Sequence, residues 1–159
     1  MERLVQALVV EPEGNNILLV FHKQGEFEGL YTGLIGYTEQ NERPELAMNR
    51  IAYELCRITL DNIELRAKFL MQVDQLGDAE ELEYFCNRYS GHVMETETVR
   101  PQWFPITGIP YQQMPPDDEI WYPAFLAGSR LEGKFLFNKE MSVITAHDMN
   151  TVEDLSALY

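Results

Sequence analysis

The segment from Pro44 to Ile58 constrains the fold most strongly, because its apolar side chains repeat with a helical period. Pro44 suits the first turn of a helix, and Glu45 suits the positive end of the helix dipole. Four apolar side chains recur at intervals of four, four and three residues and therefore share one face: Ala47, Ile51, Leu55 and Ile58. The pattern predicts a helix over residues 44–58 that buries this face.

Short β-rich runs precede this helix. Residues 3–10 and 16–22 are apolar and are separated by the turn-forming stretch Glu-Pro-Glu-Gly-Asn, which predicts a hairpin. Residues 24–32 contain Gly25 and Gly29 and show no clear period, so we expect a loop there. Binding residues are common on loops that a rigid scaffold positions, and we expect this loop to lie beside a ligand.

A second pair of β-rich runs follows the helix. Residues 65–73 and 82–89 predict another hairpin, joined by an acidic turn at residues 77–81. Acids in a turn are usually hydrated. We therefore expect the carboxylates of this turn to be solvated on the surface, namely Asp78, Glu80 and Glu81.

The last third of the chain combines a helix with a hairpin. Pro116 predicts the start of a helix that runs to residue 126 and is kinked at Pro123. Residues 134–138 and 142–147 predict a final hairpin, and residues 152–159 predict a short terminal helix. With no internal repeat and no linker, these elements predict fold class α+β, with a mixed β-sheet sandwiched between helices (α/β/α) in one domain over residues 1–159.

The charge balance narrows the possible partners. The chain holds 12 Lys and Arg against 26 Asp and Glu, a formal charge of −14. Nucleic-acid polymers and anionic membranes are therefore excluded as expected partners, whereas a mononucleotide needs only local donors and a protein partner is still possible. Cys56 and Cys86 lack zinc-ligand spacing, and the N-terminus lacks a secretory pattern, so we expect a cytoplasmic protein with two reduced thiols.

A spaced set of charged residues links the loop before the first helix to the helix itself. Gly36, Glu42, Arg50 and Glu54 follow the spacing G-x5-E-x7-R-x3-E. This resembles the Nudix box, whose usual pattern is G-x5-E-x7-R-E-U-x-E-E-x-G-U with U a bulky aliphatic residue. In the resembling family, carboxylates on the box helix hold Mg²⁺ or Mn²⁺ and assist the attack of water on a nucleoside di- or triphosphate.

The second half of the chain makes the resemblance specific. Its motifs are similar to those of the oxidised purine nucleoside triphosphate hydrolases, the MutT-like group that includes 8-oxo-dGTPases. The matching stretches are Arg100-Pro101-x-Trp103-Phe104, Pro116-Asp117-Asp118 and Gly133-x-Phe135-x-Phe137. The resemblance covers nearly the whole chain and implies the fold deduced above from the strand and helix pattern.

The box departs from the family pattern where the metal ligands belong. The first helix Glu is Ile51, the second Glu of the later pair is Leu55, and the box Gly is Arg57. Glu54 is the one carboxylate that remains among three, and Arg50 is expected to give structural support. Hydrocarbon side chains cannot ligate a hard divalent cation. We therefore expect no metal or other cofactor, with Glu54 as the ligand to Mg or Mn if the protein is active.

The base-binding residues are better preserved. The resemblance implies that Asp117 and Asp118 read the edge of a purine, with one of them protonated. It implies a base-binding role for Thr32, where the family has Asn, and for the aromatic side chains of Trp121 and Phe137. His22 replaces a family Lys that faces the substrate, so it is a candidate for contact with a phosphate or base, or a partly buried structural residue.

Three functions remain open from the sequence. The first is a Nudix-fold protein that binds a purine nucleotide or related small molecule but lacks normal metal-dependent catalysis. The second is an active Mg/Mn-dependent nucleoside triphosphate pyrophosphohydrolase with a rebuilt metal site. The third is a protein-interaction module on a Nudix scaffold.

Overall fold

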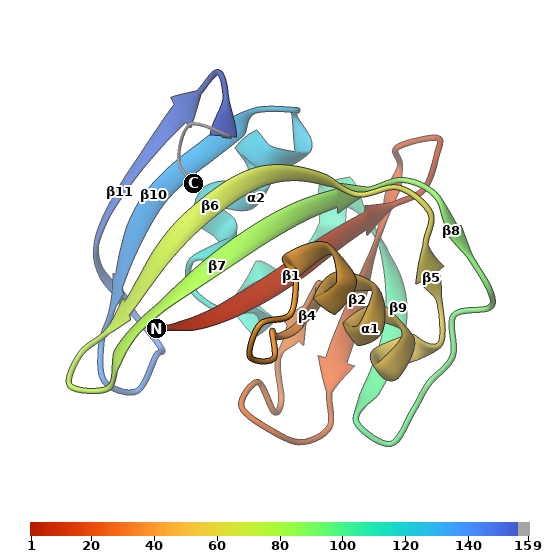
Figure 1. Cartoon of the computed structure of the whole chain (residues 1–159), viewed down its shortest axis with the longest axis horizontal. Helices are drawn as coiled ribbons and strands as arrows, with labels where there is room; N and C mark the ends of the chain where they lie inside the picture. Colours follow the sequence, from red (N-terminus) through yellow and green to blue (C-terminus); the bar gives the residue numbers. More distant parts are fainter. Residues whose placement is uncertain (156–159) are drawn as a thin grey trace.

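A computed structural model describes residues 1–155 of the chain (Figure 1). Its helices are α1 (Pro44–Cys56) and α2 (Asp118–Leu126), with short 3-10 turns at Ile106–Gly108 and Tyr111–Gln113. Its strands are β1 (Glu2–Val10), β2 (Asn16–His22), β3 (Tyr31–Thr32), β4 (Leu34–Tyr37), β5 (Thr59–Leu60), β6 (Glu64–Val73), β7 (Gly77–Cys86), β8 (Tyr89–Ser90), β9 (Val99–Pro105), β10 (Arg130–Phe137) and β11 (Ile144–Val152).

Most of these strands form one mixed sheet. The order is β11-β10-β6-β7-β1-β2-β3, with β4 also paired to β1 and β9 to β2. The pairs β1–β7 and β6–β10 are parallel, and the other pairs of this sheet are antiparallel. The two short strands β5 and β8 pair separately. The predicted α+β class with a mixed sheet and two helices is confirmed.

Strand β1 lies near the centre of the sheet and pairs with three other strands. It pairs with β7 along its length, with β4 through Leu4–Ala7, and with β2 through Val9 and Val10. Side chains alternate between the two faces of a strand. Each face of β1 therefore belongs to a different hydrophobic core.

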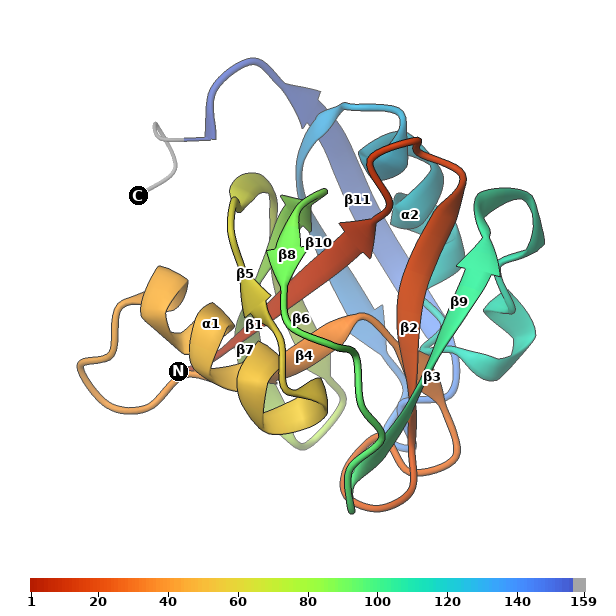
Figure 2. The same ribbon diagram turned by 90° about the vertical axis from the view of Figure 1, so that its right-hand side faces the viewer.

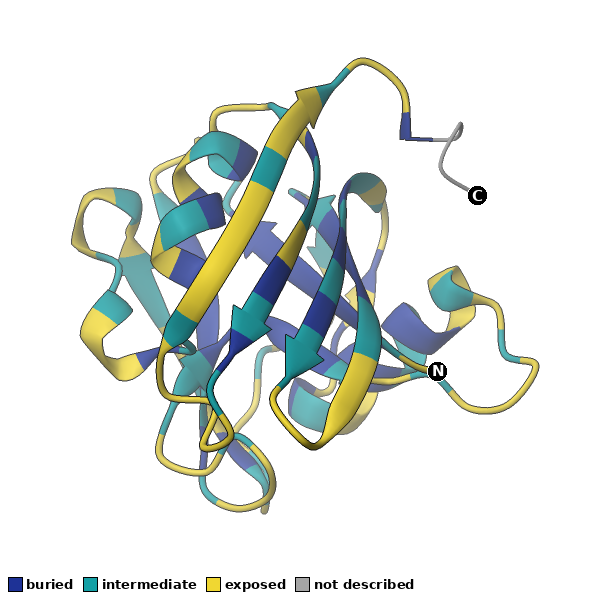
Figure 3. Cartoon of the chain, turned by 90° about the vertical axis from the view of Figure 1, so that its left-hand side faces the viewer, coloured by how far each residue is buried: buried dark blue, intermediate teal, exposed yellow. Residues whose placement is uncertain are grey.

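The helices cover opposite faces of the sheet (Figure 2). Val5, Ala7 and Val9 of β1 join the core under α1. Leu8 and Val10 join the second core, which includes the aromatic side chains of α2. The outer strand β11 is largely exposed along its length (Figure 3). Across residues 1–155 no helix is both long and apolar enough to cross a lipid bilayer.

The first predicted hairpin is confirmed by the pairing of β1 with β2, and the last by the pairing of β10 with β11. The helix predicted over 44–58 ends two residues early, at Cys56. Arg57 has a φ of 66°, in the left-handed region, and its N–H donates to the carbonyl of Tyr53. This is the geometry that terminates many helices.

The prediction of an acidic turn at residues 77–81 is wrong. These residues begin β7, and the chain reverses earlier, where Leu76 N–H donates to Val73 O at 3.0 Å and Gln75 has a φ of 65°. The predicted terminal helix over 152–159 starts inside β11, which ends at Val152. Residues 156–159 lie outside the described residues.

The box helix is held to the sheet by a close contact between Ile51 and Gly36. Ile51 is 3% exposed, and a β-carbon added at Gly36 would lie 2.9 Å from both Cγ1 and Cδ1 of Ile51. Only glycine allows the helix to approach β4 so closely at this point. Ile51 is therefore part of the core rather than of an open edge.

Ile51→Ala should lower the free energy of unfolding by about 2–5 kcal/mol, because it removes buried methyl groups and leaves a cavity. Leu46→Ala is the matched control: Leu46 lies on the same helix but is 63% exposed, and its loss should change stability by at most about 0.5 kcal/mol. Urea unfolding followed by circular dichroism measures both. Equal losses in the two variants would contradict the packing described for Ile51.

Candidate functional site

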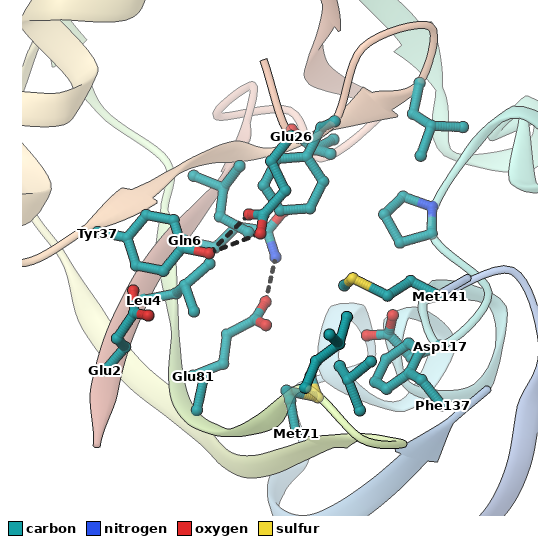
Figure 4. Close-up of a pocket in the computed structure, with 18 of the residues that line it drawn as sticks. Glu2, Leu4, Gln6, Glu26, Tyr37, Met71, Glu81, Asp117, Phe137 and Met141 are labelled. Atoms are coloured by element: carbon teal, nitrogen blue, oxygen red, sulfur yellow. Dashed lines mark hydrogen bonds between the residues drawn. The ribbon is translucent and has the colours of Figure 1, made fainter. Parts of the chain in front are cut away.

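A cavity of about 300 Å³ opens on the face of the sheet that carries α2. Its wall is built from β1, β6, β7 and β10, from the loop after β2, and from the residues that lead into α2. Figure 4 shows Gln6 and Glu81 on one side of the space and Asp117, Phe137 and Met141 on the other. The volume lies at the lower end of the range of about 300–1,000 Å³ that is usual for small-molecule sites.

Buried carboxyl groups dominate the depth of this cavity. Glu81, Asp117 and Asp118 line it and are at most 8% exposed, and Glu83 lies beside Glu81 with no exposure. The parallel register sets Leu4 beside Glu81 and Gln6 beside Glu83. Since residues two apart share a face of a strand, both glutamates point to the same side of the sheet as Gln6.

The side chain of Gln6 ties this cluster together. Its Nε2 donates to Glu83 Oε2 at 2.7 Å and to Glu81 Oε1 at 3.3 Å. Its Oε1 accepts from Gly33 N–H at 2.8 Å. A neutral amide that both donates and accepts supplies hydrogen bonds without adding charge.

Burial keeps the acid cluster close to neutrality. Burial raises the pKa of Glu81 to about 7, and burial together with the charge of Glu81 raises the pKa of Glu83 well above its usual range. The two carboxyl groups also hydrogen-bond to each other. A single shared proton resolves the repulsion between two such groups.

Asp117 and Asp118 form a second pair at the start of α2. Trp121 Nε1 donates to Asp117 Oδ2 at 2.8 Å, whereas Asp118 Oδ2 is buried and has no hydrogen-bond donor. Burial raises the pKa of Asp117, and burial with the charge of Asp117 raises that of Asp118 well above its usual range. Asp118 is therefore the member of the pair with hydrogen-bonding capacity left for a ligand.

The structure brings four of the predicted base-binding residues to one cavity. Thr32, Asp117, Asp118 and Phe137 all line it. Trp121 is not among the lining residues: it is fully buried behind Asp117, where it packs against Phe69 with ring centroids 5.3 Å apart.

His22 lies just behind the cavity wall. Its Nε2 lies 2.7 Å from Thr32 Oγ1, which itself donates to Gly33 O at 2.6 Å, so Nε2 is the donor of the first bond. Burial lowers the pKa of His22 to about 4. A neutral imidazole that is already bonded to Thr32 has no positive charge to offer a phosphate.

Arg50 organises the Nudix-box loop on the opposite face of the sheet. Its Nε and Nη2 both donate to the Glu42 carboxylate at 2.9 Å, and Nη2 also donates to Tyr37 O at 2.9 Å. The Arg50 hydrogen bonds hold the pKa of Glu42 at about 2. Nη1 of Arg50 donates to Glu54 at 3.2 Å, and the Glu54 side chain is 57% exposed. Arg50 thus anchors the loop, and Glu54 serves as one of its partners.

The residues of this box do not fit a divalent cation. Ile51 is buried against Gly36, Leu55 packs against the core, and Glu54 is paired with Arg50. Mg²⁺ is usually bound by one or two carboxylates together with water and substrate phosphates, and this helix offers Glu54 alone, which is already paired with Arg50. Throughout the part of the chain that the structure describes, no three His, Cys, Asp or Glu side chains are grouped so that they could hold a metal ion.

Gln6, Glu81 and Glu83 are the site residues that sequence reasoning missed. Glu81 was expected in a solvated turn, which is wrong: it lies in β7 and is 8% exposed. The alternation of Glu81 and Glu83 with Leu82 is a period-two pattern that could have revealed the strand. The burial of the polar face, however, depends on β1 and α2, which are distant in the sequence.

Similar proteins were found by sequence and by structure, but not by family models. No family model matches the sequence. The chain is 32% identical over 155 residues to a Danio rerio protein named oxidized purine nucleoside triphosphate hydrolase, with 96% of each chain covered. A Mus musculus protein of the same name is 25% identical over 139 residues, covering 87% of this chain and 88% of that one. The fold superposes on the mutator MutT protein of Bacillus halodurans with a TM-score of 0.81 at 18% identity, covering 94% and 98% of the two chains.

Glu83→Gln should stabilise the protein above neutral pH. The folded state holds protons on Glu81 and Glu83 at a pH where the unfolded chain has released them, so the free energy of unfolding falls as the pH rises above about 4.5, and for Glu81 it falls through about 7. Glutamine keeps the hydrogen-bonding shape without an ionisable group. At pH 8 the variant should gain about 1–3 kcal/mol over the parent, and at pH 4 the two should be nearly equal.

Urea unfolding at several pH values measures this difference. Glu80→Gln is the control on the same strand, because Glu80 pairs with Arg3 at 2.7 Å and with Lys68 at 3.4 Å. It should show no gain at pH 8. If Glu83→Gln keeps the pH dependence of the parent, Glu83 does not titrate as described.

Proposed function

Since the chain belongs to the MutT-like branch of the Nudix superfamily, with the oxidised purine nucleoside triphosphate hydrolases, we propose that it binds a purine nucleotide or a related small molecule. We propose further that it does so without normal metal-dependent hydrolysis. We take residues 1–159 as one Nudix domain that acts in the cytoplasm, where Cys56 and Cys86 stay reduced.

The chemistry of the box helix carries the proposal. Family members use helix carboxylates to hold a divalent ion against the phosphates, and this chain has Ile51 and Leu55 at two of the three positions. Ile51 is buried against Gly36 and presents no oxygen donor there. The remaining carboxylate, Glu54, is exposed and paired with Arg50, so with water and a substrate phosphate as the other ligands it would hold a divalent ion only weakly.

The cavity supports the binding half of the proposal. It retains the two aspartates of the resembling base site, with Thr32 and Phe137 beside them. These residues lie on the other face of the sheet from the box core, so loss of the metal ligands does not remove them. A rebuilt metal site would need converging donors, and residues 1–155 provide no such group.

Phosphate-release assays test the proposal directly. With dGTP or 8-oxo-dGTP and either Mg²⁺ or Mn²⁺, turnover should be at least roughly a thousandfold below that of the Danio rerio relative measured in parallel, since loss of even one group that stabilises the transition state costs about 10²–10³. Any residual rate should be the same in Glu54→Gln. Turnover near that of the relative, abolished by Glu54→Gln, would refute the proposal.

Thermal unfolding in metal-free buffer tests binding. Purine bases, nucleosides and nucleotides, including oxidised forms, form the panel. A ligand at 100 times its Kd should stabilise the folded state by about 2.7 kcal/mol and raise the Tm accordingly. If no member of the panel raises the Tm, an interaction module without a small-molecule ligand becomes the better account.

A further inference from the structure

The cavity wall carries acidic side chains at both its buried and its exposed parts. Glu81, Asp117 and Asp118 lie at its depth, and four further carboxyl side chains line it where it is exposed: Glu2, Glu26, Asp78 and Glu140. The residues that line it include no Lys, Arg or His. All the ionisable Asp, Glu, Lys, Arg and His side chains of the wall are therefore acidic, in a chain whose net charge is already −14.

The neighbouring surface does not offset this charge. The groove beside the cavity, along the box loop, is lined by Glu2, Glu39, Glu42 and Glu80, by one cationic side chain, Arg3, and by the N-terminal residue Met1. Arg3 is paired with Glu80 at 2.7 Å. Phosphates that left the cavity in this direction would meet more carboxylates, without a divalent ion to neutralise them.

The depth of the cavity has unused capacity for hydrogen bonds. Asp118 lines it, is 3% exposed, and its Oδ2 has no donor. Glu81 faces the same space from β7, opposite Asp117 (Figure 4). A buried polar atom without a hydrogen-bond partner is costly, and a ligand whose edge supplies a matching polar group removes that cost.

Apolar side chains complete the wall around these acids. Leu4, Met71 and Phe137 line the cavity, and Phe27 lines it from the loop after β2. Hydrocarbon and aromatic walls suit the faces of a planar ring, whereas the carboxyl groups suit an edge that carries N–H donors. Positive charge on such a ring would be attracted by the carboxylates at the exposed part of the wall, whereas the buried acids share protons.

We propose that this cavity selects a cationic, amino-bearing purine-type base or nucleoside that has no phosphate groups, and that it rejects the corresponding triphosphate. The proposal rests on the proposed function, because it names the ligand class of the same site. It follows from the acidic wall, the buried Asp118 oxygen without a donor, and the lack of a site for a neutralising metal.

Three probes separate ring charge from phosphate charge. 1-Methyladenosine carries a positive ring charge at pH 7 and an exocyclic amino group, adenosine lacks the charge, and adenosine triphosphate adds phosphates to adenosine. Calorimetric titration in metal-free buffer should give a Kd for 1-methyladenosine lower than that for adenosine by about tenfold or more. Adenosine triphosphate should bind more weakly than adenosine.

Salt provides a test that needs no variant. Between 0.1 M and 1 M NaCl the Debye length falls from about 10 Å to about 3 Å. Affinity for 1-methyladenosine should therefore fall, affinity for adenosine should change little, and the deficit of adenosine triphosphate relative to adenosine should shrink. Glu140→Gln, which removes a carboxyl group from the exposed part of the wall, should reduce the preference for 1-methyladenosine over adenosine, and Glu13→Gln, in an exposed turn away from the cavity, should not.

The outcomes distinguish this inference from the proposed function. Tighter binding of adenosine triphosphate or 8-oxo-dGTP than of any nucleoside would overturn the inference and leave a nucleotide-binding protein without hydrolysis. Equal affinity for 1-methyladenosine and adenosine at every salt concentration would also overturn it. If neither the probes nor the wider panel bind, the binding half of the proposed function fails, and this inference fails with it.

Discussion

The burial of four carboxyl groups on the α2 face of the sheet is the constraint on which the site depends. An ionised carboxylate taken out of water without a cation is unfavourable by several kcal/mol. Here Gln6 donates to both glutamates, Trp121 donates to Asp117, and shared protons lower the charge of each pair. These partners come from β1, β7 and α2, so the acid cluster can form only after the long-range pairing of β1 with β7 and the docking of α2.

The box helix and the cavity lie on opposite faces of β1, so a change in one need not disturb the other. Val5, Ala7 and Val9 pack under α1, whereas Gln6 reaches the acid cluster on the other side. Hydrocarbon at Ile51 extends the α1 core and adds burial where a metal-binding carboxylate would be hydrated. An apolar side chain at position 51 is therefore compatible with the fold and leaves the cavity walls in position.

Local sequence patterns were enough to predict most helices and strands. Where these elements end, and which of their side chains are buried, depends on packing between residues that are distant in the sequence. The four-residue spacing of Ala47, Ile51 and Leu55 was enough to predict α1, but its last turn depended on the left-handed conformation of Arg57, which propensity does not favour for a side chain of this kind. The acids at 77–81 resembled a hydrated turn because their burial comes from strands far away in the sequence. For the same reason, Asp117 and Asp118 could be proposed by resemblance, whereas Gln6 and Glu83 could not.

The same electrostatic argument applies to both faces of the sheet. A triphosphate is accepted by a protein when cations from side chains or metal ions balance its charge. On one face this chain has Ile51 and Leu55 where the resembling box pattern has glutamates, and on the other face carboxyl groups line a cavity whose lining residues include no Lys, Arg or His. For a phosphorylated ligand the two features would each raise the free energy of the complex. For a cationic, phosphate-free ring the acidic wall is favourable and no metal site is needed, so one class of ligand is compatible with both features.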